Sequence, residues 1–186
     1  MYTGATFDTS GNFFVGSSTG TLTIQDAMDK LVDIIDASDN AFIKAYQAST
    51  AGVIDGRGLA GYEIINGSST GSNVIFAGDG GSQLWGNSGS DADALVGGNG
   101  ADIFNGGRFQ GADNIFNASS ADVVNLTDAT LSDIVATAGN DSGVAIGFNT
   151  GNVVNIQSTD ALSAAINLAD GSSWRYNHVT KGWQSA

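Results

Sequence analysis

The sequence is poor in several residue types that globular proteins ordinarily use. Its 186 residues include no cysteine, no proline, one histidine and one glutamate. The absence of cysteine excludes disulfides and thiolate chemistry. The six Lys and Arg residues are scattered and form no basic stripe, which argues against nucleic acid and against an anionic membrane surface as partners.

Long apolar runs are missing as well. No stretch reaches the roughly eighteen consecutive apolar residues that a membrane-spanning helix needs, so we expect no membrane insertion. The N-terminus has no charged segment followed by an apolar one, the pattern of a secretory signal peptide. A secretory route, if used, would therefore be signalled elsewhere, or its signal is missing from this sequence.

Glycine, aspartate and apolar residues dominate what remains. The chain has 27 glycines, 41% apolar residues and a net charge of −13, and Glu63 is its single glutamate. That apolar content is typical of a folded chain rather than a disordered one. Aspartate combined with glycine and asparagine is typical of tight turns and of oxygen-ligand cation sites.

The sequence repeats with a period of twenty residues from Arg57 onward. Each repeat has a six-residue polar turn, a three-residue strand, an eight-residue polar turn and a second three-residue strand. The expected strand centres are large and apolar throughout: Ile64, Leu84, Phe104 and Val124 in the first strand, and Ile75, Leu95, Ile115 and Val135 in the second. Such a period predicts an all-β parallel β-roll, or β-solenoid, in which each coil adds one strand to each of two facing sheets. The alternative is an antiparallel sandwich of short hairpins.

Three regions follow from this pattern. We expect an N-terminal cap over residues 1–56, a β-roll over 57–136, and a C-terminal capping or secretion-type region over 137–186. A cap is needed because the last coil of a solenoid exposes an open sheet edge.

Shorter elements are expected inside the two caps. The helical spacing of apolar residues predicts a helix over residues 24–36. Strands are expected at 13–16 and 41–48, and the C-terminal cap should contain strands at 144–148 and 152–156.

Stacking turns every turn position into a column of residues. The last position of the longer turns is Asn73, Asp93, Asp113 and Asp133, and that of the shorter turns is Tyr62, Ser82, Asp102 and Asp122. Carboxylates ~4.8 Å apart repel by on the order of 3 kcal/mol per pair at an effective dielectric near 20. Calcium relieves this repulsion because it takes six to eight oxygen ligands, whereas magnesium keeps its waters and zinc prefers His or Cys. The alternative is that these side chains only close Asx-turns.

One segment carries a specific resemblance. GGNGADIFN, residues 97–105, is similar at every position to the G-G-x-G-x-D-x-U-x nonapeptide of the RTX calcium-binding repeat family. The segments at 77–85, 86–96 and 106–116 resemble the same motif with substitutions or two extra residues. The resemblance implies a calcium-loaded β-roll, type I secretion and folding outside the cell.

The columns and the motif together give the candidate calcium ligands. They are Asp79, Asp91, Asp93, Gly97, Asn99, Asp102, Gly106, Gly111, Asp113, Asp122 and Asp133. The glycines are included because their backbone carbonyls can bind a cation, and the missing side chain lets the backbone approach it closely.

Three functions compete. The first is an extracellular, cell-surface or secreted calcium-binding module that folds when calcium binds. The second is a self-assembling surface-layer, filament or adhesin subunit that stacks with other copies. The third is a polysaccharide-binding module or polysaccharide-active enzyme. No nucleophile, carboxylate-pair or histidine motif indicates catalysis, so we expect no enzyme.

Overall fold

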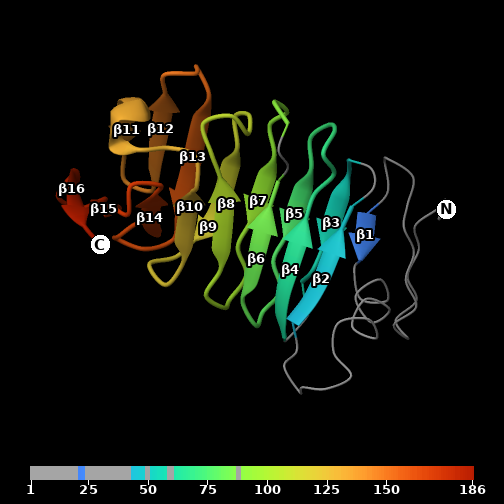
Figure 1. Ribbon diagram of the computed structural model, residues 1–186. Coiled ribbons are helices and arrows are strands. Elements are labelled where there is room, and N and C mark those ends of the chain that lie inside the picture. Colours follow the sequence, from blue (N-terminus) through green and yellow to red (C-terminus); the bar gives the residue numbers. More distant parts are fainter. Residues whose placement is uncertain (1–20, 24–42, 49–50, 58–60, 87–88) are drawn as a thin grey trace.

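The chain forms two facing β-sheets built from short strands, and residues distant in sequence stack as neighbouring coils (Figure 1). The computed structural model describes residues 21–23, 43–48, 51–57, 61–86 and 89–186. The pairing between successive coils is parallel. The architecture is therefore the parallel β-solenoid that the sequence predicts, and not an antiparallel sandwich.

The two sheets alternate along the chain. The first sheet has the order β1-β3-β5-β7-β9-β13-β12-β11 and the second has the order β16-β15-β14-β10-β8-β6-β4-β2. Strands of the first sheet are β1 (Thr21–Thr23), β3 (Val53–Asp55), β5 (Val74–Phe76), β7 (Ala94–Val96), β9 (Asn114–Ala118), β11 (Ile134–Gly139), β12 (Gly143–Phe148) and β13 (Val153–Ser158). Strands of the second are β2 (Ile43–Gln47), β4 (Tyr62–Asn66), β6 (Ser82–Trp85), β8 (Ile103–Gly106), β10 (Val123–Leu126), β14 (Ala165–Leu168), β15 (Ser173–Asn177) and β16 (Gly182–Ser185).

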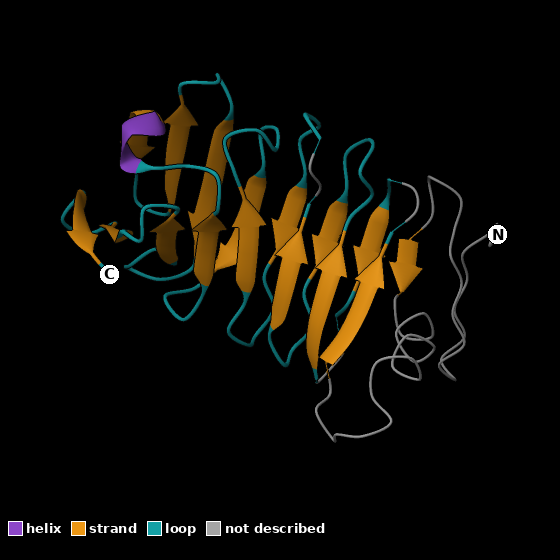
Figure 2. Ribbon diagram, viewed as in Figure 1, coloured by secondary structure: helices purple, strands orange, loops and turns teal. Residues whose placement is uncertain are grey.

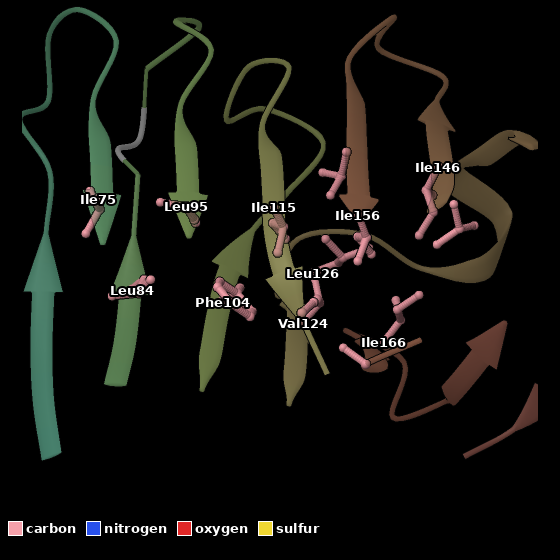
Figure 3. Close-up of a cluster of buried hydrophobic side chains, with 14 of the residues drawn as sticks. Ile75, Leu84, Leu95, Phe104, Ile115, Val124, Leu126, Ile146, Ile156 and Ile166 are labelled. Atoms are coloured by element: carbon pink, nitrogen blue, oxygen red, sulfur yellow. The ribbon is translucent and has the colours of Figure 1, made fainter. Parts of the chain in front are cut away.

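Buried apolar side chains from both sheets fill the space between them (Figure 3). In the first sheet Ile75 pairs with Leu95, and Leu95 pairs with Ile115. In the second sheet Leu84, Phe104 and Val124 stack in the same way. These pairs lie twenty residues apart, so the predicted period is the height of one coil. Central residues point inward because they alternate with half-buried neighbours along each strand.

Two expected core positions are wrong. In β4 the buried apolar residue is Ile65, which pairs with Leu84, while Ile64 is half-buried. The coil between Ile65 and Leu84 is therefore one residue shorter than the period. Val135 is 66% exposed in β11, and Ile156 instead occupies the position above Ile115.

The displacement of Val135 has a structural cause after β10. The chain leaves the coil there, forms the 3-10 turn η1 (Leu131–Asp133) and the antiparallel pair β11–β12, and then returns (Figure 2). Strand β13 pairs in parallel with β9, and β14 pairs in parallel with β10. Parallel stacking thus continues past residue 136, and the excursion through β11 and β12 lies inside it.

The ends of the solenoid differ from its middle. Strands β12 and β13 match the expected strands at 144–148 and 152–156, and they pair antiparallel. Strands β14, β15 and β16 are also antiparallel, as expected of a C-terminal β cap. The expected strand at 41–48 is β2, whereas the strand at 13–16 and the helix at 24–36 fall outside the described residues. No helix in the described part of the chain is long and apolar enough to cross a membrane.

Candidate functional site

The candidate site consists of two columns of buried polar residues, each standing where a turn ends and a strand begins. The long-turn column contains Asn73, Asp93 and Asp113, which precede β5, β7 and β9. The short-turn column contains Ser82 at the start of β6, together with Asp102 and Asp122, which precede β8 and β10. No residue of either column is more than 1% exposed. The parallel register places these side chains above one another, as the sequence predicts.

Within the short-turn column, each carboxylate accepts a hydrogen bond from the coil before it. The backbone N–H of Ser82 donates to Oδ1 of Asp102, and the N–H of Asp102 donates to Oδ1 of Asp122, both at 2.8 Å. The second oxygens close their own turns. Oδ2 of Asp102 accepts from the N–H of Gly98 at 2.8 Å, and Oδ2 of Asp122 accepts from the N–H of Ser119 at 2.6 Å. Each oxygen has a second lone pair, so accepting one N–H leaves it able to bind a further partner.

The long-turn column begins with the same ladder. The N–H of Asn73 donates to Oδ1 of Asp93 at 2.6 Å, and the N–H of Asp93 donates to Oδ1 of Asp113 at 3.1 Å. Asn73 also closes its turn, because its Oδ1 accepts from the N–H of Ser68 at 3.0 Å and its Nδ2 donates to the Ser68 carbonyl at 3.2 Å. An uncharged amide thus fulfils the turn-closing role in this column.

Asp93 differs from the other column residues. Its Oδ2 is buried and has no hydrogen-bond partner within the described ranges. Gly86 lies directly against it, and a Cβ on residue 86 would collide with that oxygen. A buried anionic oxygen without a partner is costly, and a cation is one way to satisfy it.

Burial and mutual repulsion act on the acidity of both columns. Burial raises the pKa of Asp113 to about 7, and the charge of Asp93 adds to the rise while the Asp93 N–H opposes it. Burial raises the pKa of Asp102 to about 6, with a further rise from the charge of Asp122. Burial also raises the pKa of Asp93, and the N–H and side-chain amide of Asn73 partly offset the rise. Ionised carboxylates in these columns therefore destabilise the fold near neutral pH unless a cation accompanies them.

The short-turn column contains a carboxylate that the sequence interpretation missed. Glu63, fully buried in β4, pairs with Ser82 and takes the column position that was assigned to Tyr62. The Ser82 hydroxyl donates to Oε2 of Glu63 at 3.2 Å. The signal was present in the sequence, because a slip of one residue aligns the chain's single glutamate with Ser82.

Asp133 does not belong to the long-turn column, contrary to the sequence interpretation. It caps η1, where its Oδ2 accepts from the N–H of Thr130 at 2.9 Å, and it forms an ion pair with Arg108. Its Oδ1 also accepts from the Asn149 amide at 3.1 Å. The Thr130 N–H and hydroxyl hold the pKa of Asp133 below its usual value. The excursion after β10 moves this residue away from Asp113.

Three other candidate ligands lie at exposed turn tips. Oδ1 of Asp79 accepts from the Asn99 amide of the next coil at 2.7 Å. Oδ2 of Asp91 accepts from the N–H of Gly71 at 2.9 Å. Asp79, Asn99 and Asp91 thus stack between coils, but they remain solvent-facing and apart from the buried columns.

The candidate glycines sit close to the columns. A Cβ on Gly97 would lie 3.2 Å from Oδ2 of Asp102, and one on Gly106 would lie 3.7 Å from Oδ2 of Asp113. Gly111 has a φ of +91°, and a Cβ there would collide with the Asp91 carbonyl. The turn at Gly111 therefore needs glycine, because the backbone there has a positive φ and leaves no room for a side chain.

No protein-family model, curated protein or solved structure matches this chain. Within the described residues, no three His, Cys, Asp or Glu side chains gather closely enough to hold a metal ion on their own. A cation held by two column carboxylates would need turn carbonyls or water for its remaining ligands. The residues present supply only oxygen ligands, which is the chemistry that calcium prefers.

Proposed function

We propose that this chain is an extracellular calcium-binding β-roll module of the RTX type, which folds when calcium binds. The observation that carries the proposal is the stacked pair Asp93 and Asp113, buried between neighbouring coils, in which one carboxylate oxygen of Asp93 has no hydrogen-bond partner among the described residues. Asp102 and Asp122 form the equivalent pair in the short turns. The proposed cofactor is Ca²⁺, and the proposed role is binding and folding rather than catalysis.

The energetics favour control by calcium. Without a cation, folding has to bury carboxylates whose charged forms are disfavoured. A ligand that binds only the folded state stabilises it by RT ln(1 + L/Kd) at free ligand concentration L, which is about 1.4 kcal/mol per site at a concentration ten times its dissociation constant. Extracellular calcium modules have dissociation constants of roughly 10⁻⁴–10⁻³ M, so millimolar calcium outside a cell would shift the equilibrium toward the folded state. This supports a secreted or cell-surface location and export of an unfolded chain by type I secretion.

Calorimetric titration with calcium tests the binding sites. We expect Asp113→Asn and Asp102→Asn each to weaken or remove a calcium-binding event, because each removes one of two stacked charges. The matched control is Asp141→Asn, since Asp141 is exposed and forms an ion pair with Lys181 rather than a contact within either column. Unchanged calcium binding in both column variants would contradict the proposal, as would an equal loss in Asp141→Asn.

A second candidate function is self-assembly into a surface layer, filament or adhesin. The observation that favours it is strand β11, which ends the first sheet and leaves one of its edges unpaired within the described chain. Residues 134–139 carry no charge, and nearly all of the strand is exposed. Unprotected edges of this kind pair with other chains.

Light scattering and electron microscopy with and without calcium test this assembly. We expect Val135→Lys to disrupt assemblies, because a lysine on an edge strand blocks edge-to-edge pairing. A protein that stays monomeric in calcium at high concentration would rule assembly out.

A further inference from the structure

A groove of about 470 Å³ lies over the outer face of the first sheet, between β9, β11, β12 and β13. These strands lie side by side at the C-terminal end of the solenoid (Figure 1). The volume of the groove falls in the range of roughly 300–1,000 Å³ that is usual for small-molecule sites. The calcium proposal does not use this surface.

The groove arises from a step in side-chain size across neighbouring strands. The register aligns Asn114 of β9, Asn155 of β13, Ala145 of β12 and Ala138 of β11 in one row. In the next row Gln157 of β13 faces a glycine of β12. Long side chains on β9 and β13 thus stand beside alanine and glycine on β11 and β12. The small residues form the floor, and the long ones form a wall.

The wall presents fixed amide groups and an aromatic ring. The Nδ2 group of Asn155 donates to Oδ1 of Asn114 at 3.1 Å, and the Nδ2 group of Asn114 donates to the Ala112 carbonyl at 3.3 Å. These bonds orient both amides along the sheet. No described residue donates to Oδ1 of Asn155, and the Gln157 side chain has no hydrogen bond within the described chain. Phe116, which also lines the groove, is 39% exposed.

The lining contains no charged residue, although the whole chain carries a net charge of −13. A charged ligand would find no counter-charge in the groove. A purely apolar ligand would leave the amides without partners, which costs binding energy. The ligand that fits is neutral, rich in hydroxyl groups and provided with an apolar face. Amides pair with hydroxyls, and an exposed aromatic ring packs against the apolar face.

We propose that this groove binds a neutral polysaccharide, with Asn155 and Gln157 hydrogen-bonding sugar hydroxyls and Phe116 packing against a sugar ring. The proposal identifies a surface for polysaccharide that is separate in its chemistry from the carboxylate columns. Calcium at saturating concentration keeps the fold constant in its test, so failure of either proposal leaves the other standing.

Affinity electrophoresis in native gels tests the groove directly. Gels contain dextran, amylose, a β-1,3-glucan or a β-1,4-mannan as neutral polymers, and alginate or polygalacturonate as anionic ones, all with calcium. We expect at least one neutral polymer, and neither anionic polymer, to retard the protein. Phe116→Ala, Gln157→Ala and Asn155→Ala should each weaken retardation by about tenfold in apparent affinity, the loss expected for one good contact. Ala145→Trp, which fills the floor, should abolish it.

Matched controls separate a local effect from a general one. Phe109→Ala removes an exposed phenylalanine of the long turn at 106–113, and Gln184→Ala removes an exposed glutamine of β16 in the other sheet. Both should be retarded like the unmodified protein, and circular dichroism in calcium should show that every variant is folded. Lack of retardation in all four neutral polymers overturns the proposal. Equal retardation of the Ala145→Trp variant, or retardation by anionic polymers alone, overturns it as well.

Discussion

The backbone N–H of Asp102 donates a 2.8 Å hydrogen bond to Oδ1 of Asp122, which stands twenty residues later and one coil further along the solenoid. Both residues are buried, so the carboxylate that satisfies one coil's backbone also adds a negative charge beside the carboxylate of that coil. The columns therefore stabilise through hydrogen bonds and destabilise through charge. A bound cation would neutralise this repulsion. The repulsion can also be tested without calcium, by measuring the stability of the calcium-free protein.

Replacing Asp113 by Asn should stabilise the calcium-free protein. Asn73 shows that an amide closes the same turn without charge. Burial raises the pKa of Asp113 to about 7, so its charged form opposes folding at pH 8. We expect a gain on the order of 1–3 kcal/mol in the free energy of unfolding at that pH, since each tenfold weakening of an acid corresponds to about 1.4 kcal/mol. Circular dichroism in chelator at pH 8 measures it, as the folded fraction while the osmolyte trimethylamine N-oxide is added. In calcium the order of the two proteins should reverse.

The stability of the calcium-free protein should fall as the pH rises from about 5.5 to about 7, and then level off. The pKa of Asp102 is raised to about 6 and that of Asp113 to about 7, so between pH 5.5 and these values the folded state binds more protons than the unfolded chain. Stability falls with pH wherever the folded state holds more protons. The carboxyls with lowered pKa, such as Asp133 and Asp160, are ionised throughout this window. The folded fraction in metal-depleted buffers, read by circular dichroism at each pH, checks the slope.

A control for the pH slope is the double variant Asp102→Asn, Asp113→Asn. Its calcium-free stability should change much less over the same window. A slope of equal size in that variant would assign the pH dependence to other groups.

Core substitutions test the stacking register. Leu95 is fully buried between the sheets, and its replacement by Ala should destabilise the protein by about 2–5 kcal/mol. Val135 is 66% exposed, and its replacement by Ala should change stability by no more than about 0.5 kcal/mol. Thermal unfolding in calcium compares the two. Equal losses would place Val135 in the core, as the uninterrupted period predicted.

Two glycines with similar backbone angles distinguish strain from collision. Gly111 and Gly151 have φ values of +91° and +89°, so a side chain is strained at either position. A Cβ at Gly111 would also collide with the Asp91 carbonyl, while one at Gly151 has nothing within 4 Å. We expect Gly151→Ala to cost about 1–2 kcal/mol in urea unfolding from backbone strain alone. Gly111→Ala should cost at least about 1 kcal/mol more, because its Cβ also collides with the Asp91 carbonyl.

Much of the fold follows from the sequence because the apolar centres and polar turns repeat at one interval. Phe104 and Leu95 fall where a twenty-residue coil places them. The period could not reveal where the coils are interrupted. Counting on from Ile115 gives Val135, but the chain leaves the solenoid after β10 and returns at Ile156. The Thr130–Asp133 capping box was the local signal that a new element begins there.

The candidate site was predictable to a similar extent. The register places Asp93 above Asp113 and Asp102 above Asp122, and the twenty-residue repeat predicts both pairs. Glu63 was missed because Ile64 and Ile65 are both apolar, and a one-residue slip between them reverses which side chains point inward. That slip also hid the shorter coil before Leu84. The amide-lined groove depends on the antiparallel return of β12 beside β13, which the turn period does not encode.

The most direct test of calcium-dependent folding is far-ultraviolet circular dichroism of the full chain during a calcium titration from excess chelator into millimolar calcium. If the stacked carboxylates need a cation, the chelated protein gives the spectrum of an unfolded chain and becomes β-rich as calcium is added. Magnesium at the same concentration should have a much smaller effect, because it keeps its waters and demands a rigid octahedron. A β-rich spectrum that is unchanged by chelator and by calcium at pH 8 would contradict calcium-dependent folding.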